Sequence, residues 1–288
     1  MMFRQGQVIN LVLSVLVLIL VAGCAGGAAP IVLPDPIGDA EAGAYLVSVA
    51  VGCGCHFDRD TSSLAGGRVF EGGFGKQPVP NLTSHSTGLG DWTDQEIIDA
   101  IRLGKGRDSE NLFIMPSSDY NVMSDEDVLD LVAYLRSLDP VENEVPDREL
   151  GFDPPGYEAQ ATSAKAPLGA VARGEYLVTI ARCTRCHTPN LEEGGKNMDM
   201  FLAGAPLREQ VAPNLTPDRE TGIGTWSQSE IASFLQTGQY SDGEMAEGAM
   251  ESQINGGLHA LTDRDAAAIA AFLKSIDAVK NLPELPES

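Results

Sequence analysis

Residues 182–189 read "RCTRCHTP", a segment in which two residues separate Cys183 from Cys186 and His187 follows directly. A shorter version of the pattern occurs in "VGCGCHFD" at residues 51–58, where one residue separates the two cysteines. When "GAYLVSVAVGCGCH" is aligned with "GEYLVTIARCTRCH", the histidines of the two segments coincide. The chain therefore contains two copies of one unit.

The repeat continues beyond these segments. "PNLT" occurs at residues 80–83 and 213–216, and Trp92 in "TGLGDW" aligns with Trp226 in "TGIGTW". "MSDEDVLDLVAYLRSLD" then matches "LTDRDAAAIAAFLKSID". Two units of about this size are expected to form two domains.

Helical signals predominate in both units. Residues 39–50 and 172–182 are expected to form short first helices that end near the Cys–His segments. Later helix starts are marked by a Ser or Thr three positions before an acidic residue: Thr93 to Glu96, Ser124 to Asp127, Ser227 to Glu230 and Thr262 to Asp265. Apolar residues at helical spacing follow Ser124 and Thr262, and no alternating pattern competes. The predicted fold is all-α.

The Cys-x-x-Cys-His segment is the attachment signature of a c-type haem. Its thiols of Cys183 and Cys186 add to the haem vinyl groups, and His187 ligates the iron. A zinc half-site and a thiol redox pair are the alternatives, but neither a second Cys/His cluster nor a βαβ pattern accompanies the segment. The sequence therefore predicts covalent haem c in the second unit.

The repeat extends this prediction to the first unit, where His56 is the expected iron ligand. Cys55 is placed to form its thioether normally, whereas Cys53 has to reach the other vinyl group from a shorter arc. Flexible glycines at Gly52 and Gly54 favour both bonds forming. Attachment through Cys55 alone is the alternative. Two covalently bound haem c groups are predicted in all.

The N-terminus predicts export. An apolar run follows Arg4 and ends in "VAGC", which is too short for a comfortable membrane span and resembles a bacterial lipoprotein signal. Cleavage before Cys24 would leave this thiol to carry lipid; an uncleaved anchor helix is the alternative. Either form places the protein on the periplasmic or extracellular side, held to a membrane.

Disulfides are a further use of cysteines in an exported protein, but a disulfide between Cys53 and Cys55 would be badly strained.

The expected boundaries follow from these signals. A signal peptide is predicted over 1–23, a tether over 24–37, a first haem domain over 38–145, a Pro-rich linker over 146–167 and a second haem domain over 168–281. The net charge of −22 is spread over both halves and excludes nucleic acid as a partner, because nucleic-acid binding depends on cationic side chains. Such a charge suits a basic redox partner.

A sixth iron ligand is expected in each unit. Met115 precedes Pro116, which holds it in extended loop backbone, and its place before the last helix favours ligation. Met123 directly precedes that helix and is interpreted as core packing. His85 lies in a polar loop and is interpreted as a surface residue.

The second unit lacks the Met-Pro pair. Its candidates are Met245, Met250 and His259, of which Met250 lies nearest to the equivalent position before the last helix. His259 aligns with a turn position and is interpreted as a solvated loop residue.

Taken together, these segments resemble the dihaem and trihaem c-type cytochromes of class I fold. The resemblance is strongest to the cytochrome subunits of membrane-bound alcohol, gluconate and fructose dehydrogenases, and it covers most of residues 40–280. It implies two tandem class I cytochrome c domains in which the first and last helices cross at Gly43/Tyr134 and at Gly174/Phe272. It also implies Met115 and Met250 as distal ligands. Trp92 and Trp226 are expected near haem edges or in buried aromatic structure.

The expected function is electron transfer by a membrane-anchored dihaem carrier, with no substrate chemistry of its own. Its expected partners are redox proteins, namely a dehydrogenase, an oxidase or another cytochrome. The alternative is a dihaem redox enzyme of the peroxidase or thiosulfate-oxidising type, with an exchangeable ligand at one haem.

Overall fold

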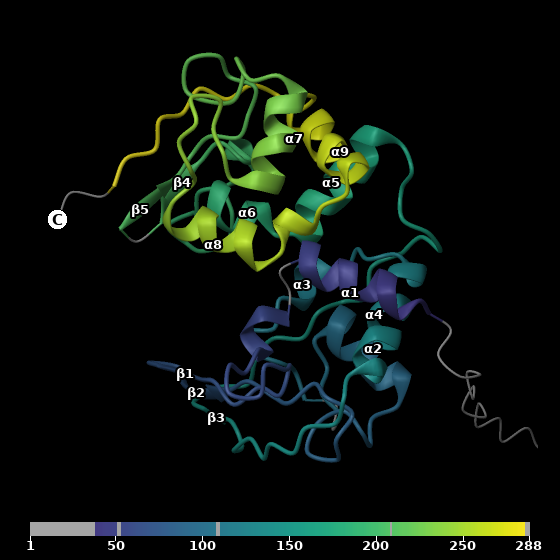
Figure 1. Cartoon of the computed structure of the whole chain (residues 1–288). Coiled ribbons are helices and arrows are strands. Elements are labelled where there is room, and N and C mark those ends of the chain that lie inside the picture. The colour runs from purple at the N-terminus through teal and green to yellow at the C-terminus, as the bar shows by residue number, and fades with distance from the viewer. Residues whose placement is uncertain (1–37, 51–52, 108–109, 208, 286–288) are drawn as a thin grey trace, which may run out of the picture. The chain divides into compact units, whose positions relative to one another are not determined.

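The computed structural model describes residues 38–50, 53–107, 110–207 and 209–285 (Figure 1). The predicted signal peptide and tether, Cys24 and Gly52 lie outside these residues. Within them, no helix is long and apolar enough to cross a membrane.

The two repeats share the order of their main helices, and the second has two additional 3-10 turns. The first contains α1 (Ala40–Val49), the 3-10 turn η1 (Cys53–His56), α2 (Asp94–Leu103), α3 (Ser117–Tyr120) and α4 (Asp125–Ser137). The second contains α5 (Ala170–Ile180), α6 (Cys183–His187), η2 (Met198–Met200), α7 (Gln228–Thr237), α8 (Gly248–Gly256), η3 (Leu258–Ala260) and α9 (Asp263–Leu273). Two helical domains in tandem are therefore confirmed.

The helix boundaries follow the local sequence. Capping boxes begin α2 at Thr93 and α7 at Ser227. In each, the hydroxyl accepts from the N–H of the third helical residue, a glutamate whose side chain accepts from the backbone N–H of the capping residue. Both helices end at a glycine in the left-handed region, Gly104 at φ 62° and Gly238 at φ 73°.

The first and last helices of each repeat cross at a glycine. A Cβ on Gly43 would lie 2.0 Å from a backbone oxygen of α4 and 2.7 Å from the Cβ of Tyr134. A Cβ on Gly174 would lie at the same distances from a backbone oxygen of α9 and from the Cβ of Phe272. Both crossings occur where the sequence resemblance predicts them.

Short strands depart from the all-helical expectation. An antiparallel sheet joins β1 (Val69–Gly72), β2 (Gly75–Pro78) and β3 (Glu149–Leu150), and a hairpin joins β4 (Ala205–Leu207) to β5 (Gln210–Ala212). These strands have two to four residues, and few of these residues are buried. Segments this short and this little buried carry no detectable alternation, which is why the sequence did not reveal them.

The connection between the repeats is held against the first one. It contains β3, and its Arg148 donates to the Asn111 carbonyl and pairs with Glu110 at 2.9 Å. Further on, the carbonyl of Ser163 accepts from the backbone N–H of Asp125 at the start of α4. The segment expected as a linker thus covers part of the first repeat.

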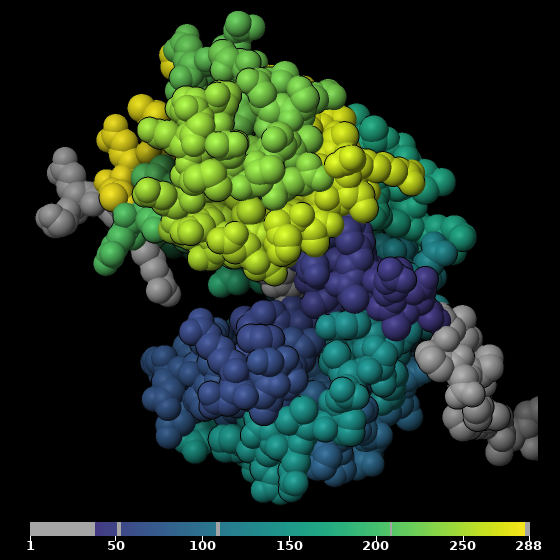
Figure 2. All heavy atoms as spheres, viewed as in Figure 1, coloured from purple at the N-terminus to yellow at the C-terminus, as the bar shows by residue number. Residues whose placement is uncertain are grey.

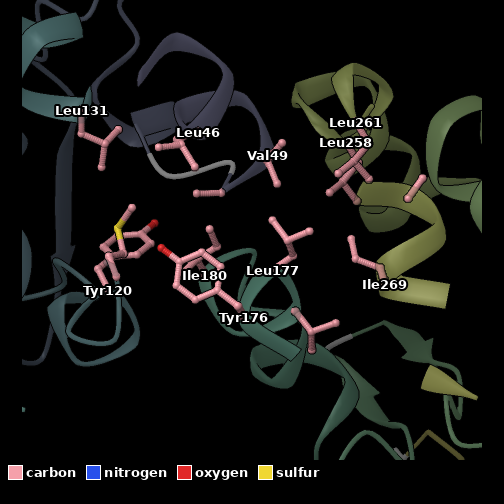
Figure 3. Close-up of a cluster of buried hydrophobic side chains, with 14 of the residues drawn as sticks. Leu46, Val49, Tyr120, Leu131, Tyr176, Leu177, Ile180, Leu258, Leu261 and Ile269 are labelled. Atoms are coloured by element: carbon pink, nitrogen blue, oxygen red, sulfur yellow. The ribbon is translucent and has the colours of Figure 1, made fainter. Parts of the chain in front are cut away.

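One hydrophobic cluster includes buried side chains of both repeats. Figure 3 shows Leu46 and Val49 of α1 together with Leu258 of η3 and Leu261, which directly follows η3. Figure 2 shows the purple atoms of α1 against yellow-green atoms of the second repeat. The two repeats therefore share apolar surface.

Candidate cofactor sites

Each Cys–His segment presents its histidine in the same way. Nδ1 of His56 lies 2.8 Å from the carbonyl oxygen of Pro80, and Nδ1 of His187 lies 2.8 Å from the carbonyl oxygen of Pro213. A carbonyl oxygen only accepts hydrogen bonds, so Nδ1 donates in both cases. The lone pair of each imidazole is then on Nε2, the atom left for a metal.

Both imidazoles are held in the neutral form that ligates metals. Their exposed fractions are 8% for His56 and 9% for His187. Burial lowers the pKa of each ring, and the proline carbonyl opposes this only in part. A neutral, oriented imidazole therefore recurs at equivalent places.

The proline carbonyls are fixed by the "PNLT" segments. Asn81 donates to the carbonyl of Val141 at 2.8 Å, and its own side-chain oxygen accepts from the backbone and hydroxyl of Thr83. Asn214 makes the same contacts in the second repeat, to Val279 and Thr216. Sequence reasoning used these segments only to align the repeats and missed their role in orienting the histidines.

A glycine completes each arrangement. The N–H of Gly66 donates to the carbonyl of His56 at 2.8 Å, and that of Gly204 donates to the carbonyl of His187 at 2.7 Å. Both glycines have positive φ, 74° and 86°, and a Cβ on Gly66 would lie 2.4 Å from the Pro80 oxygen. Only glycine lets the chain fold back this closely over the proline loop.

The cysteines lie beside these histidines as free thiols. Burial, followed by the charge of the neighbouring cysteine, raises the pKa of Cys53 to about 12. Burial likewise raises the pKa of Cys183 to about 12. Cys53, Cys183 and Cys186 are half-buried, whereas Cys55 is exposed. Zinc binding and dithiol redox chemistry need thiolates, which such burial disfavours.

The methionine candidates differ in their surroundings. Met115 is half-buried, packs on the hydrophobic cluster and follows Ile114, whose φ of 69° is in the left-handed region. Met250 of α8 is also half-buried on the cluster and lies two residues after Gly248, whose φ is 63°. The positions of Met115 and Met250 at the edge of the core suit distal ligands, and their ligation remains a prediction.

The other candidates lie in different environments. Met123 is fully buried, as expected for core packing, whereas 56% of Met245 is exposed. His259 is exposed, and its Nδ1 lies 3.0 Å from the Ile254 carbonyl. His85 makes a local contact with Thr87. Among the described residues, no group of three His, Cys, Asp or Glu side chains is gathered to hold a metal ion.

The two tryptophans are half-buried. Their carbonyls accept from equivalent cations of the last helix, Trp92 from Arg136 and Trp226 from Lys274. Trp226 also packs edge-on against Phe234, with ring centroids 5.7 Å apart. Trp226 therefore takes part in aromatic packing, while a place near a haem edge stays a prediction for both tryptophans.

The comparisons with known proteins agree with this geometry. A cytochrome c family model matches residues 41–139 and again 171–277, which together are most of the chain. The chain belongs to the cytochrome c family and has two cytochrome c domains.

Among the relatives, the fructose dehydrogenase cytochrome subunit of Gluconobacter japonicus is 32% identical over 82% of this chain and 52% of its own length. The gluconate 2-dehydrogenase cytochrome c subunit of Pantoea cypripedii is 30% identical, over 82% of this chain and 59% of its own length. The chain thus spans little more than half of these subunits. A dihaem c-type cytochrome of Cereibacter sphaeroides is 29% identical over 92% of this chain and 97% of its own length.

Haem c, bound covalently in each domain, is the cofactor of this family, and the residues present fit it. Each domain offers two thiols beside a neutral imidazole whose Nε2 is available. In the first domain the Tyr120 hydroxyl is buried and has no hydrogen-bond partner among the described residues. Burial raises the pKa of Tyr120, and Cys53 lies close enough to raise it further. A buried hydroxyl without a partner fits a further group bound beside it in the first domain. The relatives named above are cytochromes or cytochrome subunits, which supports an electron-transfer role for this chain.

Proposed function

We propose that this protein is a lipid-anchored dihaem cytochrome that transfers electrons between redox proteins outside the cytoplasm. The observation that carries the proposal is the duplicated histidine geometry. In both domains a buried imidazole beside a cysteine pair donates Nδ1–H to a proline carbonyl at 2.8 Å.

The residues take equivalent roles in the two domains. The two cysteine pairs would form thioethers with haem. His56 and His187 would ligate its iron through Nε2, and Met115 and Met250 would supply a second ligand to each iron. The sites are these residues: Cys53, Cys55, His56, Met115, Cys183, Cys186, His187 and Met250. Haem contributes an iron that changes oxidation state by one electron. The protein fixes the tautomer of each imidazole through the hydrogen bond at Nδ1, and burial keeps water away from the imidazole ring. Electron transfer would require no change in the iron ligands.

The proposed partners follow from the relatives and from charge. Two relatives are named as cytochrome subunits of dehydrogenases, which favours a dehydrogenase as electron donor and a further cytochrome or an oxidase as acceptor. A net charge of −22 favours partners with a basic docking face. Lipid on Cys24 would keep the carrier at a membrane surface.

The test uses the purified protein with and without its N-terminal segment. We expect two haems per chain, thioethers on all four cysteines by peptide mass spectrometry, and lipid on Cys24. A redox titration should resolve two one-electron steps with a methionine-to-iron charge-transfer band, and the reduced protein should not bind carbon monoxide. Ready carbon monoxide binding or peroxide turnover would instead identify a dihaem enzyme with an exchangeable ligand. One haem per chain would contradict the proposal.

A further inference from the structure

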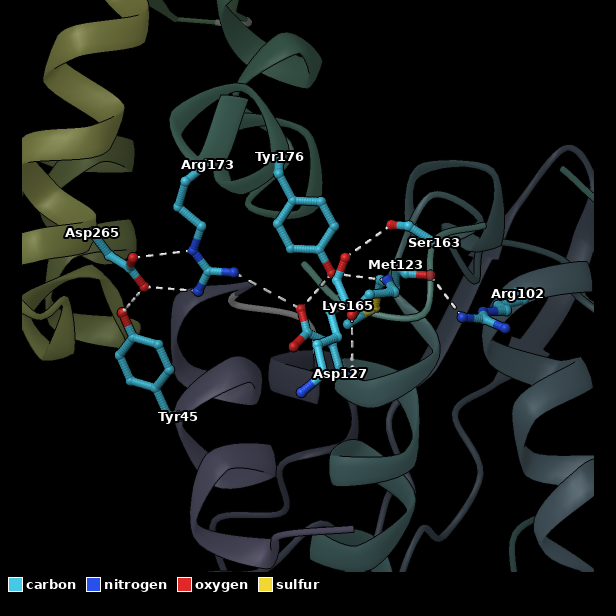
Figure 4. A network of polar contacts seen from close by, with 10 residues as sticks. Tyr45, Arg102, Met123, Asp127, Ser163, Lys165, Arg173, Tyr176 and Asp265 are labelled. Atoms are coloured by element: carbon cyan, nitrogen blue, oxygen red, sulfur yellow. Dashed lines mark hydrogen bonds and ion pairs between the residues drawn. The ribbon is translucent and has the colours of Figure 1, made fainter. Parts of the chain in front are cut away.

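The contact between the two domains is built from matching residues. The Tyr45 hydroxyl donates to Asp265 at 2.7 Å, and the equivalent Tyr176 hydroxyl donates to Asp127 (Figure 4). Each tyrosine comes from the first helix of one domain, and each aspartate from the first turn of the last helix of the other. We call this set the repeat interface: Tyr45, Asp119, Asp127, Arg173, Tyr176, Arg182 and Asp265.

One arginine serves both carboxylates. Arg173 binds Asp265 through two hydrogen bonds of 3.0 and 2.9 Å, and its Nη1 lies 4.0 Å from Asp127. The side chains of Arg173 and Asp265 are 14% and 7% exposed, and that of Asp127 is 12% exposed. A guanidinium fork shared between two buried carboxylates fixes geometry more strictly than a surface ion pair.

The helices that lead into both Cys–His segments end at this contact. A Cβ on Gly257, beside η3 of the second domain, would lie 1.9 Å from the carbonyl oxygen of Ser48 near the end of α1. Arg182, which directly precedes Cys183, donates to Asp119 of α3 in the first domain at 2.8 Å. Both attachment segments therefore begin next to the interdomain contact.

Apolar packing connects the same segments. Cys53 and Cys183 each pack against the hydrophobic cluster that includes Tyr120, Tyr176 and Ile180. Figure 3 shows the last three of these side chains close together between α3 and α5. Both attachment segments thus contact the same cluster of buried side chains. Packed side chains carry electron coupling better than solvent does.

We propose that the repeat interface is the internal electron route of the protein, and that Arg173 and the Asp119–Arg182 pair are positioning residues for it. The inference rests on the proposed function of the two domains. In one exchange, ferrous iron in one domain loses one electron and ferric iron in the other gains it. No bond forms or breaks and no proton moves. Because electronic coupling falls steeply with distance, loosening this contact slows exchange without changing either haem site.

The experiment compares three variants of the full-length holoprotein. Asp119→Asn removes the partner of Arg182, and Arg173→Gln removes the shared cation. Glu110→Gln removes the Arg148–Glu110 pair, which has a similar length of 2.9 Å but lies within the first domain and its linker. After flash reduction of one haem, we expect internal equilibration to slow several-fold in Asp119→Asn and further in Arg173→Gln. Glu110→Gln should equilibrate at the wild-type rate.

Two further measurements distinguish slower electron transfer between the domains from a disrupted fold or haem site. Calorimetry should show one unfolding transition in the wild type and two in Arg173→Gln, because the domains no longer unfold together. The spectra and potentials of both haems should be unchanged in Asp119→Asn, which removes a half-exposed pair and is expected to fold. Unaltered equilibration in both interface variants would overturn the inference. A wild type that holds one haem or accepts no electrons would instead refute the proposed function.

Discussion

At the scale of single residues, a hydrogen bond from Nδ1 of each histidine to a proline carbonyl leaves Nε2 as the ring nitrogen that is free to bind a metal. The Cys-x-x-Cys-His pattern made His187 predictable, and the repeat extended this to His56. The carbonyls of Pro80 and Pro213 were not predictable in the same way, because a backbone acceptor leaves no side-chain signal. The only trace in the sequence is that "PNLT" occurs twice.

Gly66→Ala tests this residue-scale arrangement. The new Cβ would lie 2.4 Å from the Pro80 oxygen, at a φ of 74° that alanine disfavours. We expect a loss of about 1–3 kcal/mol in the free energy of unfolding, together with weaker retention of haem in the first domain. Denaturant unfolding and haem content measure these effects. Gly73→Ala, where a Cβ meets nothing within 4 Å, is the control and should behave as the wild type.

At the scale of elements, helix boundaries were predictable because caps are local, and strands were not. The capping boxes at Thr93 and Ser227 and the glycine stops were read directly from residue type and spacing. The pair β1 and β2 depends instead on a turn at Gly75 with φ 109° and on pairing with β3, which is distant in sequence. Non-local pairing of exposed residues has no periodic signature.

Gly43→Ala tests the helix crossing. Its Cβ would lie 2.0 Å from a backbone oxygen of α4, which no side-chain rearrangement relieves. We expect α1 and α4 to separate, with a destabilisation of about 1–3 kcal/mol, seen as a lower midpoint of thermal unfolding. Gly151→Ala, at a site with nothing within 4 Å, should leave the midpoint unchanged. A fully stable Gly43→Ala protein would show that the crossing is wrong.

At the scale of the whole molecule, the sequence predicted two domains but not that they share a buried contact. Tyr45 and Tyr176 align in the repeat, yet nothing in the sequence shows that each binds the other domain. The segment expected as a linker also contacts the first domain, because β3 pairs with β2 and Arg148 donates to the Asn111 carbonyl. Relative placement of domains depends on contacts between segments that are far apart in the chain.

The two tyrosines give an internal comparison at this scale. Tyr176 is 7% exposed, donates to Asp127 and accepts from the N–H of Ser124 at 3.1 Å, whereas Tyr45 is only half-buried. We expect Tyr176→Phe to cost about 2 kcal/mol of unfolding free energy, because Asp127 and Ser124 both lose a partner in a buried site. Tyr45→Phe should cost clearly less. Equal losses in urea unfolding would contradict the difference in burial.

Acid should weaken the same contact. Burial opposes ionisation of Asp265, but hydrogen bonds from Arg173 and Tyr45 outweigh it and lower the pKa of Asp265 below its ordinary value of 3.8. A group whose folded-state pKa is depressed contributes stability above its unfolded pKa and loses it as the pH falls through the folded pKa. We therefore expect the coupling of the two domains to be complete at neutral pH and to weaken below about pH 4. Calorimetry across this range should show the single transition separating into two, and Asp265→Asn should show separate transitions even at neutral pH. If the wild type kept one transition well below the pKa of Asp265, the carboxylate would not be what joins the domains.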